Sequence, residues 1–380
     1  MQTLQASFRY NPVHSHIFIE KQFYKNNEIV SLITEKSKQT VVIVDSYIDQ
    51  RVLDLIVNTL KPSLVVPVDC KEENKSRESK ATLEDILLAN HIHKDCTIIC
   101  IGGGMLCDLV GFLASTYLRG VDLVLVPTTL LCMTDAAIGG KTAVNIRNIK
   151  NVIGTFYPAR LVIVDPAFLL TLPETELQSG IAEVIKYGLI MDQGLFQLIK
   201  DSYHLFQNKD IPFFEDIIQR SITSKISVTE RDLLDCGIRQ TLNFGHTIGH
   251  GLEAFFNFKI THGQAIAIGM CIESYISFEK GFLSRHEVTI LYDTFLKYEF
   301  PLHLASQIDI ETLFGIMVSD KKSTSDTIRI ICLESIGSIV NRSGNYLEPI
   351  TKAETVNGIN DLLSFIKGAH GKPSNISINT

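Results

Sequence analysis

The sequence lacks several patterns that mark membrane, secreted and disulfide-rich proteins. No apolar run approaches the roughly 18–20 residues of a membrane-spanning helix, so no membrane partner is expected. Residues 1–9 lack a basic region followed by an apolar one, and we therefore expect no signal peptide. The eight cysteines include no Cys-x-x-Cys pair, which favours buried, reduced thiols in the cytoplasm. Those in hydrophobic stretches are Cys96, Cys100, Cys107, Cys132, Cys271 and Cys332.

An excess of basic charge is also missing. The chain has 35 Lys and Arg against 42 Asp and Glu, a net charge of -7 and a pI of about 5.9. This balance argues against a nucleic-acid surface as the main function. Hydrophobic residues make up 45% and charged residues 20%, as in a soluble globular protein. At 380 residues the chain is too long for one ordinary core, so two domains are expected.

Compact apolar runs, separated by segments of helical periodicity, occupy the first half of the chain. Near-continuous hydrophobicity is typical of strands buried on both faces of a parallel sheet. Helical periodicity in Glu84–Asn90 and Leu106–Thr116 completes a βαβ layout and predicts an α/β domain. The predicted strands are His16–Glu20, Thr40–Val44, Leu64–Val68, Thr97–Ile101, Leu123–Pro127 and Leu161–Asp165.

Polar or glycine-rich residues follow several of these runs. Gly102-Gly103-Gly104 lies where a strand passes into a helix, and such glycines let the backbone approach a pyrophosphate. The Gly-x-Gly-x-x-Gly fingerprint is absent, however, and a tight strand-to-helix turn is an equal explanation. Asp45 is placed to accept from a ribose hydroxyl, although a turn or helix cap is the commoner role. Gly-Gly-Lys141 is either a loop or a turn that presents lysine to an anion.

From about Thr171 the sequence is mostly helical, and Arg239–His250 stands out within it. We expect this stretch to be one helix, which would place Arg239, Asn243, His246 and His250 on one stripe. His262 follows at the expected start of the next helix. If the two helices form a hairpin, His246 and His262 would supply two of the nitrogen ligands that a zinc site needs. Core-edge histidines with ordinary hydrogen bonds explain the same spacing.

A third ligand must come from elsewhere, since the zinc-protease pattern His-Glu-x-x-His is absent. Glu183 lies three residues before Lys186 in the apolar helix expected over Leu177–Ile190. Such pairs are usually surface salt bridges, but a carboxylate in apolar surroundings requires a partner or a metal. Further along, Ile328–Cys332 and Ser338–Asn341 are expected to form a small hairpin.

Taken together, these motifs resemble the 3-dehydroquinate synthase family, from about residue 40 to about residue 345. No single motif decides, but their order along the chain is specific. They are Gly102-Gly-Gly-x-x-x-Asp108, Thr116-Tyr-Leu-Arg119-Gly, Pro127-Thr-Thr-Leu-Leu, Gly139-Gly-Lys141-Thr-x-x-Asn, Lys150-Asn151-x-Ile-Gly, Ala182-Glu183-Val-Ile-Lys186-Tyr-Gly, Arg239-x-x-x-Asn243-x-Gly-His246-x-x-Gly-His250, His262-Gly and Asp320-Lys-Lys.

The resemblance implies a Rossmann-like NAD-binding α/β domain over residues 1–171 and a mostly α-helical metal- and substrate-binding domain over 172–367. Residues 368–380 are expected to form a disordered tail. The active site would lie in the cleft between the domains of a cytoplasmic homodimer. By motif, the zinc ligands would be Glu183, His246 and His262, with cobalt as an alternative metal. The implied NAD contacts are Asp45, Glu72, Lys75, Gly103, Gly104, Asp108, Thr128, Thr129, Lys141, Lys150 and Thr171.

The same resemblance implies conversion of 3-deoxy-D-arabino-heptulosonate 7-phosphate to 3-dehydroquinate and phosphate, with NAD used and regenerated in each turnover. Arg239 and Lys225 would pair with the substrate carboxylate, and Asp135 and Lys186 would also contact the substrate. The implied phosphate contacts are Lys141, Asn151, Asn243, His250, one of Lys321 and Lys322, and Arg119 of the partner subunit.

Two departures from the family pattern and three alternative functions accompany this interpretation. Lys71 replaces the usual glycine before Glu72, which loosens the alignment of Glu72 and Lys75. Asp232-Leu-Leu-Asp235 replaces the usual Asp-Glu-x-Glu. The alternatives are another sugar phosphate cyclase, such as a 2-deoxy-scyllo-inosose synthase, a metal-dependent polyol dehydrogenase, and a catalytically inactive NAD-binding protein.

Overall fold

The computed structural model describes residues 14–147, 149–319 and 327–370, which form two compact units. The first unit takes in the chain up to Thr128 together with Ala136–Ala167. The second takes in Thr129–Asp135 and the chain from Phe168 onward. The short excursion Thr129–Asp135 was not expected from the sequence.

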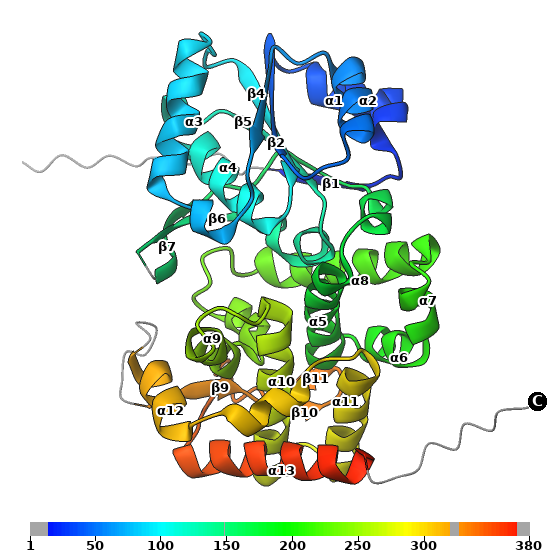
Figure 1. The fold of residues 1–380 in the computed structure, drawn as a ribbon, viewed down its shortest axis with the longest axis vertical. Coiled ribbons are helices and arrows are strands. Elements are labelled where there is room, and N and C mark those ends of the chain that lie inside the picture. The colour runs from blue at the N-terminus through cyan, green and yellow to red at the C-terminus, as the bar shows by residue number, and fades with distance from the viewer. Residues whose placement is uncertain (1–13, 148, 320–326, 371–380) are drawn as a thin grey trace, which may run out of the picture. The chain divides into compact units, whose positions relative to one another are not determined.

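A six-stranded, all-parallel sheet forms the centre of the first unit, with strand order β1-β8-β5-β4-β2-β3 (Figure 1). All six predicted runs are strands of this sheet, so the prediction of a parallel α/β sheet is confirmed. The central strand β4 is buried along its whole length, as its unbroken hydrophobicity predicts. The bounds are β1 (His16–Ile19), β2 (Gln39–Asp45), β3 (Leu64–Val68), β4 (Cys96–Gly102), β5 (Asp122–Pro127) and β8 (Leu161–Val164).

Helices cover both faces of this sheet, with α1 and α2 on one side and α3 and α4 on the other (Figure 1). Side chains of Asn26, Asp49 and Ser76 accept backbone N–H groups at the first three helix starts. The fourth helix instead begins after Gly103 with no side-chain cap, which leaves backbone N–H groups at that end. The bounds are α1 (Asn27–Thr34), α2 (Gln50–Leu60), α3 (Arg77–Ala89) and α4 (Gly104–Thr116).

An antiparallel hairpin of β6 (Lys141–Ile146) and β7 (Ile149–Phe156) completes the first unit. We had interpreted the region around Lys141 as a loop or phosphate-binding turn, and the hairpin was missed. Gly139 and Gly140 lie directly before this strand, and their φ angles of 87° and 69° suit glycine. Lys141 is therefore the first residue of a strand, and its side chain is exposed.

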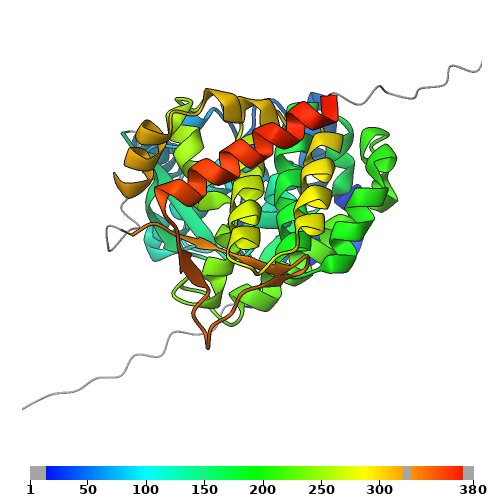
Figure 2. The same ribbon diagram turned by 90° about the horizontal axis from the view of Figure 1, so that it is seen from below.

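Helices dominate the second unit, and the nearly uniformly apolar α10 is its central helix. Residues Ala265–Ile272 of this helix are buried on every side, as expected for a helix without a polar face. It packs against α5 and α9, and α13 lies across it (Figure 2). The bounds are α5 (Glu174–Ile190), α6 (Gln193–Asp201), α7 (Tyr203–Gln207), α8 (Ile211–Thr229), α9 (His246–Phe255), α10 (His262–Glu279), α11 (Arg285–Lys297), α12 (Ile310–Ser319) and α13 (Lys352–His370).

The prediction of one helix over Arg239–His250 is wrong. A 3-10 helix, Ile238–Asn243, ends before Phe244, and α9 begins at His246. Gly245 separates them with a left-handed φ of 76°, and a Cβ there would lie 2.3 Å from Cγ of Met270. Close packing against α10 therefore interrupts the helix, and the four polar residues do not share one helical stripe.

The predicted hairpin near the C-terminus has different pairing. β9 (Arg329–Ile331) pairs with β12 (Leu347–Pro349), and β10 (Leu333–Ser335) forms a hairpin with β11 (Ser338–Ile339). Gly337, with a φ of 90°, lies in the turn between β10 and β11. Helix α13 continues to His370, and the rest of the predicted tail lies outside the described residues. No helix among the described residues is long and apolar enough to cross a membrane.

Replacing Gly269 with alanine is expected to destabilise the second unit by about 1–3 kcal/mol or more, the usual range for overpacking. A Cβ at Gly269 would lie 2.1 Å from the carbonyl oxygen of Gly245, so α9 and α10 would have to separate. Gly315 in α12 is the matched control, because nothing lies within 4 Å of its Cβ position. Alanine there should stabilise the protein by up to about 1 kcal/mol. Urea unfolding of both variants measures the difference, and equal effects would contradict it.

Candidate active site

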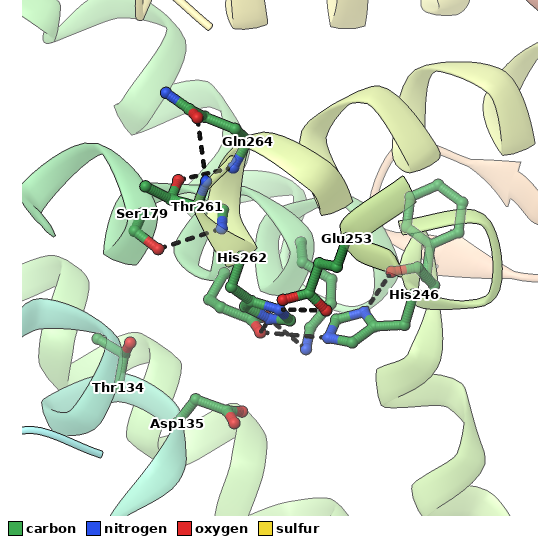
Figure 3. Close-up of polar contacts among 12 residues, drawn as sticks. Thr134, Asp135, Ser179, His246, Glu253, Thr261, His262 and Gln264 are labelled. Carbon is green, nitrogen blue, oxygen red and sulfur yellow. Dashed lines mark hydrogen bonds and ion pairs between the residues drawn. The ribbon is translucent and has the colours of Figure 1, made fainter. Parts of the chain in front are cut away.

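The three predicted metal ligands lie together in the second unit. Glu183 comes from the middle of α5, while His246 and His262 are the first residues of α9 and α10. Oε1 of Glu183 lies 3.3 Å from Nε2 of His246 and 3.1 Å from Nε2 of His262 (Figure 3). One ligand atom from each residue lies within 4.8 Å of the others. One carboxylate and two imidazoles are a donor set that zinc accepts, and three protein ligands leave a position for substrate.

Local contacts hold His262 at this position. Thr261 and Gln264 form a capping box at the start of α10, which makes His262 the first helical residue, as predicted (Figure 3). The N–H of Gly263 donates to Oγ of Ser179, one turn before Glu183 on α5. A Cβ at Gly263 would lie 2.4 Å from Cα of Ser179, so only glycine permits this contact.

The cluster is strongly polarised, with Glu183 buried, His246 nearly so and His262 partly exposed. Burial opposes ionisation of Glu183, but Lys186, at 2.6 Å, and His246 outweigh it and hold its pKa well below the usual range. Burial lowers the pKa of His246. Burial also disfavours protonated His262, yet its contacts with Glu183 and Glu253 raise its pKa to about 9. Glu183 is thus ionised, the form in which a carboxylate binds a metal, whereas His262 would release a proton on binding one.

A second polar cluster contains Asp135, Tyr187 and Lys225. Lys225 lies 3.0 Å from Oδ1 of Asp135 and also donates to its backbone carbonyl, while the Tyr187 hydroxyl donates to the same carboxylate. Burial raises the pKa of Asp135, but Lys225 and Lys186 outweigh it and lower that pKa to about 2. Burial lowers the pKa of Lys225. Such closely placed buried charges are typical of functional sites.

Arg239 is the largest of the almost fully buried side chains, with 2% of its surface exposed. Its guanidinium Nη1 donates to the carbonyl of Leu233 at 2.7 Å, and its backbone N–H donates to Asp232. Burial lowers its pKa, while acidic neighbours, Asp235 and Asp135 foremost, oppose that shift. Asn243 ends the same 3-10 helix. His250 lies one turn after His246, and their ring centroids are 5.3 Å apart.

Several predicted NAD contacts lie around Lys75 in the first unit. Nζ of Lys75 is 2.6 Å from Asp108 and 2.5 Å from Oδ1 of Asn151, and the lysine is 4% exposed. Asn145 joins this group, since it donates to Glu72 at 2.8 Å and accepts the N–H of Asn151 at 2.9 Å. Asn151, predicted to bind phosphate, is therefore held beside the predicted NAD contacts.

The remaining predicted contacts are more dispersed. Asp45, Gly103 and Gly104 lie at the carboxyl ends of β2 and β4, the edge at which ligands bind in open α/β sheets. Thr128 follows β5 and donates its N–H to Gly102, and Thr129 accepts the N–H of Cys132. Lys321 and Lys322 lie outside the described residues. Exposed side chains are those of Arg119, Lys141, Lys150 and Thr171.

Sequence reasoning missed two residues that contact these clusters. Tyr187 follows Lys186 directly, but nothing in the spacing showed that its hydroxyl reaches Asp135. Glu253 lies seven residues after His246 and three after His250, on the same helical face. That periodicity was visible in the sequence and would have singled out Glu253 once α9 was known to begin at His246.

Glu273, on α10, forms a hydrogen bond to the residue that precedes α9. It is fully buried, and its Oε2 accepts the N–H of Gly245 at 2.7 Å. Its Oε1 has no hydrogen-bond partner among the described residues. Burial raises the pKa of this carboxyl to about 8. The folded protein therefore keeps a proton that the unfolded chain releases above the ordinary value of 4.5.

Glu273→Gln is expected to flatten the pH dependence of stability. The contribution of a group with a raised folded pKa is complete below about pH 4.5 and is lost as pH rises towards 8. The slope approaches about 1.4 kcal/mol per pH unit at most, so the variant should exceed the parent in stability at pH 8. Urea unfolding from pH 5 to 9 measures this. Glu354→Gln, which removes a carboxylate paired with Lys280, is the control, and equal slopes for the parent and Glu273→Gln would refute the prediction.

Comparison with solved structures defines the class of fold as that of the sugar phosphate cyclases. The 2-epi-5-epi-valiolone synthase of Streptomyces hygroscopicus aligns with a TM-score of 0.85 and 23% identity, covering 95% of this chain and 99% of that chain. A 2-deoxy-scyllo-inosose synthase aligns with a TM-score of 0.82 and 25% identity, covering 91% and 96%. These two structures contain NAD⁺ with Zn²⁺ and NAD⁺ with Co²⁺, respectively.

Sequence comparison gives the family within that class. Models of the N-terminal and C-terminal parts of 3-dehydroquinate synthase match residues 65–179 and 180–323. The 3-dehydroquinate synthase of Chlorobaculum parvum is 35% identical over 336 residues, covering 85% of this chain and 90% of that protein. Those of Dictyoglomus thermophilum and Sulfolobus acidocaldarius are 41% and 42% identical, covering 72% and 70% of this chain and 77% and 78% of their own lengths. The chain belongs to the 3-dehydroquinate synthase family.

Proposed function

We propose that this protein is a 3-dehydroquinate synthase of the shikimate pathway. It converts 3-deoxy-D-arabino-heptulosonate 7-phosphate to 3-dehydroquinate and phosphate, with no net change in NAD. The observation that carries the proposal is 35% identity over 85% of the chain to an enzyme of this name. The convergence of Glu183, His246 and His262 supports it, because these are the three residues that the family resemblance implies as metal ligands.

The donor set fits a divalent metal, for which zinc is proposed and cobalt is an alternative. Glu183, His246 and His262 would hold the ion, which would polarise vicinal hydroxyls of the substrate when bound. The residues prepare this site themselves. Lys186 keeps Glu183 ionised, and His246 donates Nδ1–H to the carbonyl of Phe244 at 3.0 Å, which directs Nε2 toward Glu183. Orienting bonds of this kind fix the ring and its tautomer.

Substrate binding is assigned to the buried cations of the second unit. Arg239 and Lys225 would pair with the carboxylate, for which a guanidinium offers a two-pronged donor. Asp135, which itself accepts a hydrogen bond from the Tyr187 hydroxyl, holds the Lys225 ammonium, so the cation is positioned before substrate arrives. Lys186 would contact the substrate beside the metal ligands. Phosphate contacts are proposed for Lys141, Asn151, Asn243, His250, Lys322 and Arg119 of a second copy of the chain.

NAD binding is assigned to an α/β domain over residues 1–171, and the metal and substrate to a helical domain over 172–367. The bound dinucleotide would supply reversible hydride transfer, with no net oxidation over a turnover. The backbone N–H groups at the start of α4, after Gly103, suit a pyrophosphate because no side chain caps them. The other proposed contacts are Asp45, Glu72, Lys75, Gly104, Asp108, Thr128, Thr129, Lys141, Lys150 and Thr171. A cytoplasmic homodimer completes the proposal, since Arg119 would act in the partner's site.

Phosphate release from 3-deoxy-D-arabino-heptulosonate 7-phosphate tests the function. Release is expected only with NAD present, it should stop after metal chelation, and no NADH should accumulate at 340 nm. Glucose 6-phosphate, which has no carboxylate, is the control substrate. Its conversion in preference to the heptulosonate would indicate a 2-deoxy-scyllo-inosose synthase, and accumulating NADH would indicate a polyol dehydrogenase.

A further inference from the structure

Glu253 lies against the proposed metal site without belonging to its ligand set. It is on α9, seven residues after His246, and its side chain is 7% exposed. Its Oε2 is 3.7 Å from Nδ1 of His262 (Figure 3), whereas Glu183 contacts the other ring nitrogen, Nε2. Burying a second carboxylate here is unfavourable unless it interacts with a cation or a proton donor. The position of this carboxylate therefore requires an explanation.

The two nitrogens of His262 face two different carboxylates. Nε2 is 3.1 Å from Oε1 of Glu183, and Nδ1 is 3.7 Å from Oε2 of Glu253. When Nε2 gives its lone pair to a metal, a neutral imidazole must carry its proton on Nδ1. Oε2 of Glu253 lies 3.7 Å from that nitrogen, which is longer than a hydrogen bond, so the contact would have to shorten when a metal binds. The corresponding Nδ1 of His246 lies 3.0 Å from the carbonyl of Phe244, so each ring has an oxygen acceptor behind it.

We propose that Glu253 is a positioning residue that accepts a hydrogen bond from Nδ1–H of His262. This contact fixes Nε2 toward the metal held with Glu183 and His246. The inference rests on the proposed metal site. A carboxylate acceptor increases the basicity of the metal-bound imidazole more than a backbone carbonyl does, because it carries a full negative charge. The two histidines are therefore unequal ligands. The strength with which His262 binds the metal depends on the carboxylate of Glu253 behind its ring.

The alternative role for Glu253 is that of a direct metal ligand. His250, Glu253 and His262 also bring one ligand atom each within 4.8 Å of one another. If this group held a second metal ion beside the one at Glu183, His246 and His262, then His262 would have to bridge the two ions. It would then lose both ring protons, which is far less favourable than losing one. A single ion per chain, with Glu253 behind His262, requires only the neutral imidazole.

Metal affinity of Glu253→Gln tests the proposal. Apoprotein is titrated with Zn²⁺ against a chromophoric chelator, and Co²⁺ absorption reports the ligand set. Glutamine keeps the size and one oxygen but removes the charge. The dissociation constant is expected to rise about 10- to 100-fold, as for other residues behind a metal ligand. The Co²⁺ absorption spectrum should match the parent's, because the ligand set is unchanged. Glu253→Asp, which restores the charge, should recover part of the metal affinity.

Two controls separate the outcomes. Glu354→Gln removes a partly buried carboxylate that pairs with Lys280 at the other end of α10, and its metal affinity should match the parent's. His250→Ala should also keep the parent's affinity and a stoichiometry of one ion. An unchanged dissociation constant in Glu253→Gln overturns the proposal, as does a second ion that His250→Ala abolishes. If the parent protein itself bound no metal, the proposed metal site would fail, and this inference with it.

Discussion

His246→Ala is expected to abolish stoichiometric metal binding and to lower kcat/KM by at least about a thousandfold. The variant leaves Glu183 and His262 as the only two predicted protein ligands, whereas a catalytic zinc site uses three. A bound metal supplies several kcal/mol of charge stabilisation, and about 4 kcal/mol corresponds to three orders of magnitude in rate. Metal analysis of the purified variant and phosphate release measure the two effects together.

The control for this substitution is His303→Ala, since His303 is exposed in the same unit. It should keep both metal and activity. Thermal melting of the apoproteins separates loss of the metal from loss of the fold, because the fold of α9 and α10 rests on their apolar packing. A His246→Ala protein that retained one ion per chain and full turnover would remove His246 from the ligand set.

Arg239→Ala is expected to reduce kcat/KM by about 30- to 5,000-fold, or about 2–5 kcal/mol of transition-state binding. Arg239 is 2% exposed and its guanidinium donates to the carbonyl of Leu233, so the side chain is already placed and desolvated before the substrate binds. Removing it would leave the substrate carboxylate without its main partner in a buried site. Arg239→Lys should recover only part of the loss, because an ammonium cannot form the paired hydrogen bonds of a guanidinium.

Arg220→Ala provides the matched control, because Arg220 forms exposed ion pairs with Asp216 and Asp192 on the surface of the second unit. Such pairs contribute little, and its kinetic constants should stay near those of the parent. An unchanged kcat/KM in Arg239→Ala would show that another group binds the carboxylate. A loss that disappears with a substrate analogue without phosphate would instead place Arg239 at the phosphate.

The sheet of the first unit was predictable because each of its strands is a compact apolar run in the sequence. Runs such as Ile98–Ile101 are apolar at every position, and burial on both faces explains that pattern. The hairpin of β6 and β7 was missed because its second strand is mostly exposed and carries no such run. Its pairing depends on Gly154, where a Cβ would lie 1.8 Å from the carbonyl oxygen of Thr142, a contact between residues twelve apart.

The candidate site was predictable in its chemistry and only partly in its local structure. Glu183 was selected because a carboxylate in an apolar helix needs a partner, and His262 because Thr-His-Gly-Gln begins a helix. The prediction of a continuous helix through His246 was wrong, because a local sequence pattern does not show that α10 packs closely against Gly245. Glu253 and Tyr187 were missed for the same reason: their partners, His262 and Asp135, are remote in sequence or on another element.

The sequence by itself determined the parallel α/β sheet, the helical second half and the residue types that zinc and an anionic substrate require, because periodicity and donor chemistry are local properties. Only the tertiary structure decided which oxygen faces which nitrogen. That choice depends on how closely α5, α9 and α10 approach one another, and the approach is set by glycines at their crossings, Gly245, Gly263 and Gly269, where a single Cβ would force the backbones apart.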